Sequence, residues 1–134
     1  MAIPSGGGSE VLKRAYCANW SQGAATTYID WAAADGETDA SQASAVATRV
    51  PADVILTILN IVVCRFNGGA NTFTVKLEHA SNDDIYLLDA QDIPGNGTFV
   101  YSDRIILLEG DELSFQSAGD ETDCWINYIK QDWS

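Results

Sequence analysis

Positive charge is scarce in this chain. Of its 134 residues, 7 are lysine or arginine and 19 are aspartate or glutamate, which gives a formal net charge of −12. An acidic surface repels phosphate groups, so neither nucleic acid nor an anionic membrane surface is an expected partner. The same charge favours solubility and opposes random self-association. Binding to a basic patch on another protein remains open.

Residue patterns that carry chemistry are also few. His79 is the single histidine, and the chain lacks a nucleophile elbow, a zinc-ligand pair and a phosphate loop. Acidic clusters lie at 35–39, 82–84 and 120–123, but none has the spacing of a twelve-residue calcium loop. We therefore expect no enzymatic activity, no cofactor and no specific metal. His79 is expected to be solvated or to lie at an interface.

Cysteine is limited to Cys17, Cys64 and Cys124, with no Cys-x-x-Cys spacing, which argues against a zinc or thioredoxin-type site. Three thiols cannot all pair within one chain, and each lies in a strand-like run where it would act as a small buried hydrophobe. A reducing cytoplasm is therefore the expected place of synthesis. We expect no signal peptide, because residues 1–10 have neither a basic nor an apolar region.

Helical periodicity is missing between Asp53 and Lys130. Short apolar or alternating runs recur there about every ten residues, nearly all bounded by Gly, Asn, Asp or Pro, which is typical of a β-sandwich or barrel. The sequence predicts an all-β fold, a jelly-roll-like antiparallel β-sandwich. Strands are expected over residues 11–20, 26–31, 45–50, 54–66, 72–78, 84–89, 98–101, 104–108, 112–117 and 124–130.

Two of these strands and one turn are especially well marked. In the run 72–78, Phe73, Val75 and Leu77 alternate with polar residues, as in a half-buried strand. The segment 93–97, Ile-Pro-Gly-Asn-Gly, is the strongest turn signal. A tight corner at 109–111 leads into the run 112–117, where Leu113 and Phe115 are expected to face inward.

The two ends of the chain carry the predicted partner contacts. Residues 1–10 form a Gly/Ser-rich arm that cannot bury enough apolar surface to order itself, so we expect it to become ordered on another chain. Residues 11–134 form one sandwich domain. Trp133 is expected at an interface, because a large ring near a terminus gains little unless it inserts somewhere. The predicted contact residues are Ile3, Pro4, Ser5, Gly6, Gly7, Gly8 and Trp133.

Aromatic residues near the N-terminus allow two interpretations. Tyr16, Trp20, Tyr28 and Trp31 could form a sugar-stacking platform, which would suit an adhesin. Packing in the core or between subunits is the favoured interpretation, because strand aromatics usually serve that purpose.

Several segments together resemble a known group of proteins. The opening PSGGGSEVLKRA resembles the start of many small tailed-bacteriophage virion proteins. The segments RVPA, LNIVVC, TFTVKL and IPGNGTF, at 49–52, 59–64, 72–77 and 93–99, resemble a recurrent phage structural domain. The corner LLEGDEL at 107–113 is similar to a turn of the jelly-roll domains in C1q and tumour-necrosis-factor-like trimers. The resemblance covers residues 49–129 and the arm.

This resemblance implies a non-enzymatic structural role in the virion. The favoured role is capsid decoration (cement), in which a homotrimer on the capsid exterior binds the major capsid protein or other virion proteins. The alternative is a neck, tail or fibre protein, including a glycan-binding host-attachment protein. An oligomer has independent support, because a closed symmetric assembly covers the exposed edges of a sandwich.

Overall fold

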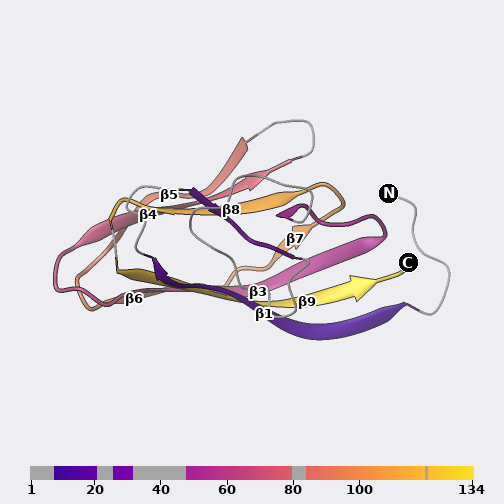
Figure 1. Ribbon diagram of the computed structural model, residues 1–134, viewed down its shortest axis with the longest axis horizontal. Helices are drawn as coiled ribbons and strands as arrows, with labels where there is room; N and C mark the ends of the chain where they lie inside the picture. Colours follow the sequence, from indigo (N-terminus) through magenta and orange to yellow (C-terminus); the bar gives the residue numbers. More distant parts are fainter. Residues whose placement is uncertain (1–7, 21–25, 32–47, 80–83, 120) are drawn as a thin grey trace.

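The protein is a sandwich of two antiparallel β-sheets, which form the two layers seen in Figure 1. The computed structural model describes residues 8–20, 26–31, 48–79, 84–119 and 121–134, without the side chains of 17–20. These residues contain no α-helix. In this described part, therefore, no helical segment has the length and apolarity needed to cross a lipid bilayer.

The described residues form strands along the whole length of the chain. They are β1 (Ser9–Trp20), β2 (Thr26–Tyr28), β3 (Val54–Arg65), β4 (Asn71–Glu78), β5 (Asp84–Ile93), β6 (Thr98–Tyr101), β7 (Ile105–Leu107), β8 (Glu112–Ser117) and β9 (Thr122–Asp132).

The order of the strands defines the fold. The first sheet has the order β1-β9-β3-β6. β7 also pairs with β3, on the same edge as β6 but along a different part of the strand. The second sheet has the order β2-β8-β4-β5. The chain crosses between sheets at most of its connections, and β4–β5 is a hairpin within one sheet. Because β6 and β7 occupy successive lengths of one edge of β3, each sheet is four strands wide, as in a jelly roll. The predicted fold class is confirmed.

Alternation along the strands builds the core. In β3, Val54, Leu56 and Ile58 face inward before a register shift, and Ile61 and Val63 face inward after it. The expected alternation in β4 is confirmed, since the core-facing side chains Phe73 and Val75 are buried and Leu77 packs against the core. In β8, Leu113 and Phe115 are buried as predicted.

Two turns occur where the sequence predicts them. The amide of Gly97 donates to the Pro94 carbonyl at 3.0 Å, and Asn96 has a φ of 55°. The amide of Asp111 likewise donates to the Leu108 carbonyl at 3.0 Å, and Gly110 has a φ of 84°. A positive φ at the third position is the mark of a type II turn, which explains the Asn and Gly there.

The strand predicted over residues 45–50 is not a strand in its described part, residues 48–50. Arg49 forms an isolated bridge with Glu112, and the Val50 amide donates to the Asp111 carbonyl at 2.9 Å. Pro51 follows directly and has no amide hydrogen to extend a ladder.

Other strand boundaries differ more modestly. β1 begins at Ser9, in register with Asp132, so it includes the last two residues of the predicted arm. β2 ends at Tyr28, before the predicted end at residue 31. β5 continues to Ile93, because a bulge with Ala90 at φ 45° lets its pairing with β4 resume.

Candidate assembly surface

The outward side of the first sheet carries several exposed apolar side chains, among them Leu12, Val100 and Ile106. Its side chains alternate with the core residues of β1, β9 and β3 and with those of β6 and β7. We call this surface the apolar face. Antiparallel register aligns its central part in rows: Tyr16, Trp125, Val62 and Val100; then Arg14, Asn127 and Asn60; then Leu12, Ile129, Thr57 and Ile106. More polar rows flank them, with Glu10, Gln131 and Ile55 at one end and Asp123, Cys64 and Thr98 at the other.

These side chains are open to solvent to an unusual degree for their type. Leu12 is 70% exposed, Ile106 60%, Val100 56% and Trp125 37%. They come from four different strands, so they form a continuous surface instead of scattered single residues. Contiguous exposed apolar surface of this kind usually marks a site of interaction.

A stacked aromatic pair forms one row of the apolar face. The rings of Tyr16 and Trp125 lie 5.6 Å apart with an interplanar angle of 17°. The Arg14 guanidinium lies 5.2 Å from the Trp125 ring centroid, within the range of a cation–π interaction. These contacts hold the two rings and the cation in one arrangement on the sheet.

The middle row of the apolar face is polar and internally hydrogen-bonded. The indole Nε1 of Trp125 donates to Asn127 Oδ1 at 2.9 Å, and Asn127 Nδ2 donates to Asn60 Oδ1 at 2.8 Å. These two hydrogen bonds join β9 to β3, and they link Trp125 in the aromatic row to Asn127 and Asn60 in the middle row. These hydrogen bonds fix the three polar side chains in position on the sheet.

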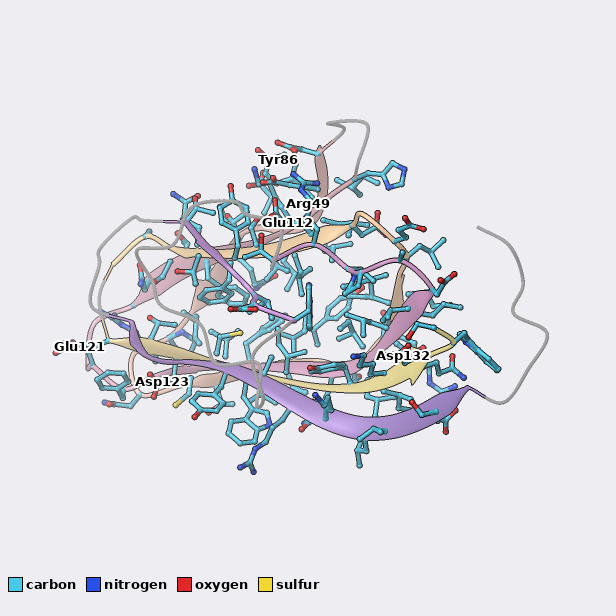
Figure 2. All side chains as sticks on the ribbon, turned by 45° about the vertical axis from the view of Figure 1, so that its right-hand side comes forward. Arg49, Tyr86, Glu112, Glu121, Asp123 and Asp132 are labelled. Atoms are coloured by element: carbon cyan, nitrogen blue, oxygen red, sulfur yellow. The ribbon has the colours of Figure 1, made fainter. Side chains whose placement is uncertain are left out.

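The two sheets differ in charge. The strands of the first sheet contain four basic residues (Lys13, Arg14, Arg65 and Lys130) and three acidic ones (Glu10, Asp123 and Asp132). The strands of the second contain one basic residue (Lys76) and five acidic ones (Glu78, Asp84, Asp89, Asp92 and Glu112). The apolar face therefore belongs to a nearly neutral sheet in a strongly acidic molecule. In Figure 2, Asp123 and Asp132 lie toward opposite ends of β9.

Lys76 organises the outward side of the second sheet. Its Nζ lies 3.2 Å from both Glu78 Oε1 and Asp84 Oδ2, and 5.8 Å from the Tyr86 ring centroid. Burial lowers the pKa of Lys76, but the hydrogen bonds and charges of Asp84 and Glu78 outweigh it, and the net shift is upward. Burial also raises the pKa of Tyr28, with further increases from the charges of Glu78 and Glu112. Tyr86, Arg49 and Glu112 all lie on this side of the molecule (Figure 2).

These two upward shifts predict a loss of stability in alkali. A group with a higher pKa in the folded protein contributes stability below its unfolded pKa and loses it as pH rises through the folded value. Urea unfolding of the wild type should therefore show falling stability above about pH 10, and Tyr28→Phe should show a shallower fall. Equal slopes for the two proteins between about pH 9 and 11 would contradict the assignment of Tyr28.

Of the predicted contact residues, the structure describes Gly8 and Trp133. Ile3, Pro4, Ser5, Gly6 and Gly7 lie outside the described residues. A Cβ on Gly8 would come 2.6 Å from Trp133 Cδ2 and 2.9 Å from the Asp132 carbonyl oxygen, so the indole packs directly on the glycine backbone. Trp133 is half-buried, its amide donates to the Asp53 carbonyl at 2.9 Å, and its Nε1 has no acceptor among the described residues.

Of the four predicted aromatic residues, the three whose side chains are described do not gather in one platform. Trp31 is buried in the core, edge-on to Tyr128 at 5.1 Å, which confirms the packing interpretation for this residue. Tyr28 lies on the outward side of the second sheet, whereas Tyr16 lies on the apolar face. The side chain of Trp20 is outside the described part. Sequence reasoning missed Trp125, whose alternation with the buried Cys124 and Ile126 indicated an outward position.

His79 makes a structural contact. Its Nδ1 lies 2.5 Å from Oδ1 of Asp111, and the other carboxylate oxygen accepts from the Leu108 amide at 2.8 Å. The pair joins the end of β4 to the turn before β8. The histidine side chain is half exposed, and the Asp111 carboxylate is nearly buried.

All three cysteines lie in strands, as predicted. Cys124 is buried and lies opposite Cys17 in the register of β1 and β9. Cys64 is half-buried in β3. Residues 35–39, 82–83 and 120 of the acidic clusters are outside the described residues. Within the described ranges, no three His, Cys, Asp or Glu side chains are grouped to hold a metal ion.

Comparison with known proteins gives distant structural likenesses alone. No protein-family model and no curated protein matches the chain. The globular domain of zebrafish complement 1qA protein is 13% identical with a TM-score of 0.45, covering 87% of this chain and 94% of that one. A chain from the disulfide-linked pili of Bacillus endospore appendages is 12% identical with a TM-score of 0.45, covering 100% and 97%. Isomalto-dextranase of Arthrobacter globiformis T6, complexed with panose, is 21% identical with a TM-score of 0.36, covering 90% and 23%. These likenesses carry no argument about function.

Proposed function

We propose that this chain is an architectural protein of a bacteriophage virion, a capsid decoration protein that binds the head shell from outside as a homotrimer. The observation that carries the proposal is the apolar face, a surface across four strands whose side chains are exposed in the single chain. A rigid sandwich with such a surface is suited to assembly. The sequence resemblance described above supports the virion as the setting.

The proposed mechanism divides the work between the sandwich and the N-terminal arm. Residues 2–7 extend across the major capsid protein or a neighbouring subunit, with Ile3 and Pro4 as anchors. Ordering the glycines costs conformational entropy, which a long extended contact offsets. The acidic second sheet faces solvent or a basic region of the capsid. The bound trimers make the shell more resistant to the internal pressure of the genome.

Deletion of residues 2–7 tests the role of the arm. This variant keeps Gly8, which packs on Trp133, and Ser9, which begins β1, so the sandwich should keep its fold and its oligomeric mass. We expect its occupancy on purified phage particles to fall to background, because the tether is gone. Quantitative gel analysis of particles incubated with the variant or the wild type measures this. Equal occupancy would rule out the arm as the tether.

Copy number separates the head from the tail. Hundreds of copies per particle would indicate a decoration protein, whereas three to a few dozen would indicate a neck, tail or fibre protein. Mass spectrometry of intact particles makes the distinction. No copies in the particle would reject a virion role altogether.

A second candidate, a glycan-binding host-attachment protein, is favoured by one observation. The stacked Tyr16–Trp125 pair, with Arg14 beside it, lies on the outward side of the first sheet, where a sugar ring could stack on the partly exposed Trp125. A glycan array probed with the isolated protein tests this candidate. Absence of binding across bacterial polysaccharides would remove it.

A further inference from the structure

We infer that the apolar face is the surface on which a second copy of this chain docks. The inference rests on the homo-oligomer of the proposed function and adds which surface and which residues form it. Its area, its charge and its polar row each favour this occupant.

The area of the apolar face is comparable with what a stable contact needs. The three long strands β1, β9 and β3 and the short pair β6 and β7, about 4.8 Å apart and rising about 3.3 Å per residue, together cover roughly 600 Å² before side-chain relief is added. A specific interface buries about 800 Å² on each partner. The face with the adjoining edges of β1 and β7 therefore supplies about one whole interface. Isolated exposed residues would not reach this size.

The distribution of charge favours a second copy over a partner of opposite charge. Two molecules that each carry −12 repel one another over most of their surfaces. On the outward side of the first sheet, the strand register places one basic residue, Arg14, and two acidic ones, Glu10 and Asp123, so the repulsion there is weaker than over the rest of the molecule. A basic partner would instead be drawn to the second sheet, where acidic residues predominate. The apolar face thus suits an identical, acidic molecule.

The polar row gives this contact a defined alignment. A purely apolar sheet surface permits sliding, whereas a polar group inside an apolar contact fixes register because misalignment leaves it unpaired. The Trp125 indole donates a hydrogen bond to Asn127, and Asn127 donates one to Asn60. The two amide groups are therefore fixed in position between two apolar rows. Arg14 adds a positive charge to the same row. We expect these groups to bond across the contact.

A matched pair of isoleucines tests the inference. Ile106 lies in β7 on the apolar face and is 60% exposed, and Ile85 lies in β5 of the second sheet and is 49% exposed. Both variants, Ile106→Glu and Ile85→Glu, add one exposed negative charge. Ile106→Glu should weaken self-association at least about a hundredfold, because the contact would bury an unpaired carboxylate. Ile85→Glu should leave it unchanged.

Sedimentation equilibrium of the purified full chain measures the outcome, with circular dichroism to confirm folding. The wild type and Ile85→Glu should have a multiple of the 14.4 kDa chain mass, and Ile106→Glu should have the mass of one chain. Leu12→Glu, at the opposite edge of the apolar face, is the second test variant and should behave like Ile106→Glu. A monomeric wild type, or dissociation by Ile85→Glu as well, would overturn the inference.

These results are distinguishable from failure of the proposed function. If Ile106→Glu and Leu12→Glu keep the wild-type oligomer mass, the surface is wrongly assigned, but a virion role stands. If the protein is absent from particles, the virion role fails, but loss of the oligomer in the two variants would still establish the docking surface.

Discussion

Replacement of Phe73 with alanine is expected to lower the free energy of unfolding by about 4 kcal/mol. Phe73 is 1% exposed and lies between two other aromatic rings, 5.3 Å from Phe99 and 5.8 Å from Phe115. Phe115 and Phe73 are on adjacent strands of the second sheet, whereas Phe99 belongs to the first. The variant therefore removes a contact that joins the two sheets and leaves a cavity between them.

Urea unfolding at one fixed protein concentration measures this loss, because self-association would otherwise shift the apparent stability. The midpoint should fall while the slope stays near the wild-type value. Phe66→Ala is the matched control, since Phe66 is 44% exposed and its truncation should cost less than about 1 kcal/mol. Similar losses in the two variants would show that the ring cluster does not hold the sheets together.

Replacement of Glu112 with alanine is expected to cost about 3 kcal/mol. Its side chain is fully buried, Thr48 Oγ1 donates to Oε2, and an Arg49 guanidinium nitrogen lies 3.6 Å from Oε1. Arg49 also donates to the Gly110 carbonyl at 3.1 Å. The carboxylate thus attaches residues 48–50 to β8. One opposing effect is present, because Glu78 is directly across from Glu112 in β4.

The magnitudes decide between these effects. A like-charge pair across two strands costs at most about 1 kcal/mol, whereas loss of one partner from a buried ion pair costs about 3 to 5 kcal/mol. Glu112→Ala should therefore destabilise the protein despite the relief of repulsion. Glu109→Ala, at an exposed carboxylate in the preceding turn, is the control and should be nearly neutral. Thermal unfolding of both variants checks the result. If Glu112→Ala leaves the stability unchanged, the Arg49–Glu112 ion pair is screened by solvent and contributes little.

Much of the fold could be predicted because its signals are local. The alternation around Phe73 fixes which side of β4 is buried, and the Asn96 and Gly110 turns require residues that tolerate a positive φ. Residues 48–50 could not be assigned in this way. The strand was predicted from the whole run 45–50, but the hydrogen bonds of residues 48–50 go to residues 110–112, about sixty positions away, and Pro51 prevents extension.

The candidate surface was harder to predict than the fold. The apolar face depends on which strands are neighbours, and β1 lies beside β9, from the far end of the chain. Leu12, Trp125 and Ile106 become one surface through this pairing alone, because nothing in their local sequences connects them. Likewise, nothing in the local sequence of Glu112, predicted as the first residue of a strand, indicated its contacts with Thr48 and Arg49. The arm and Trp133 were identified from composition and position, and the packing of Gly8 on Trp133 joins them.

The position of β9 between β1 and β3 has a consequence for how the protein is made. During synthesis the first hundred residues leave the ribosome without the strand that joins the two earliest parts of the first sheet. Pairing across such a sequence separation is slow, since a large loop must close before any contact forms. The nascent chain should therefore remain incompletely folded until β9 (Thr122–Asp132) has emerged and can pair with both β1 and β3.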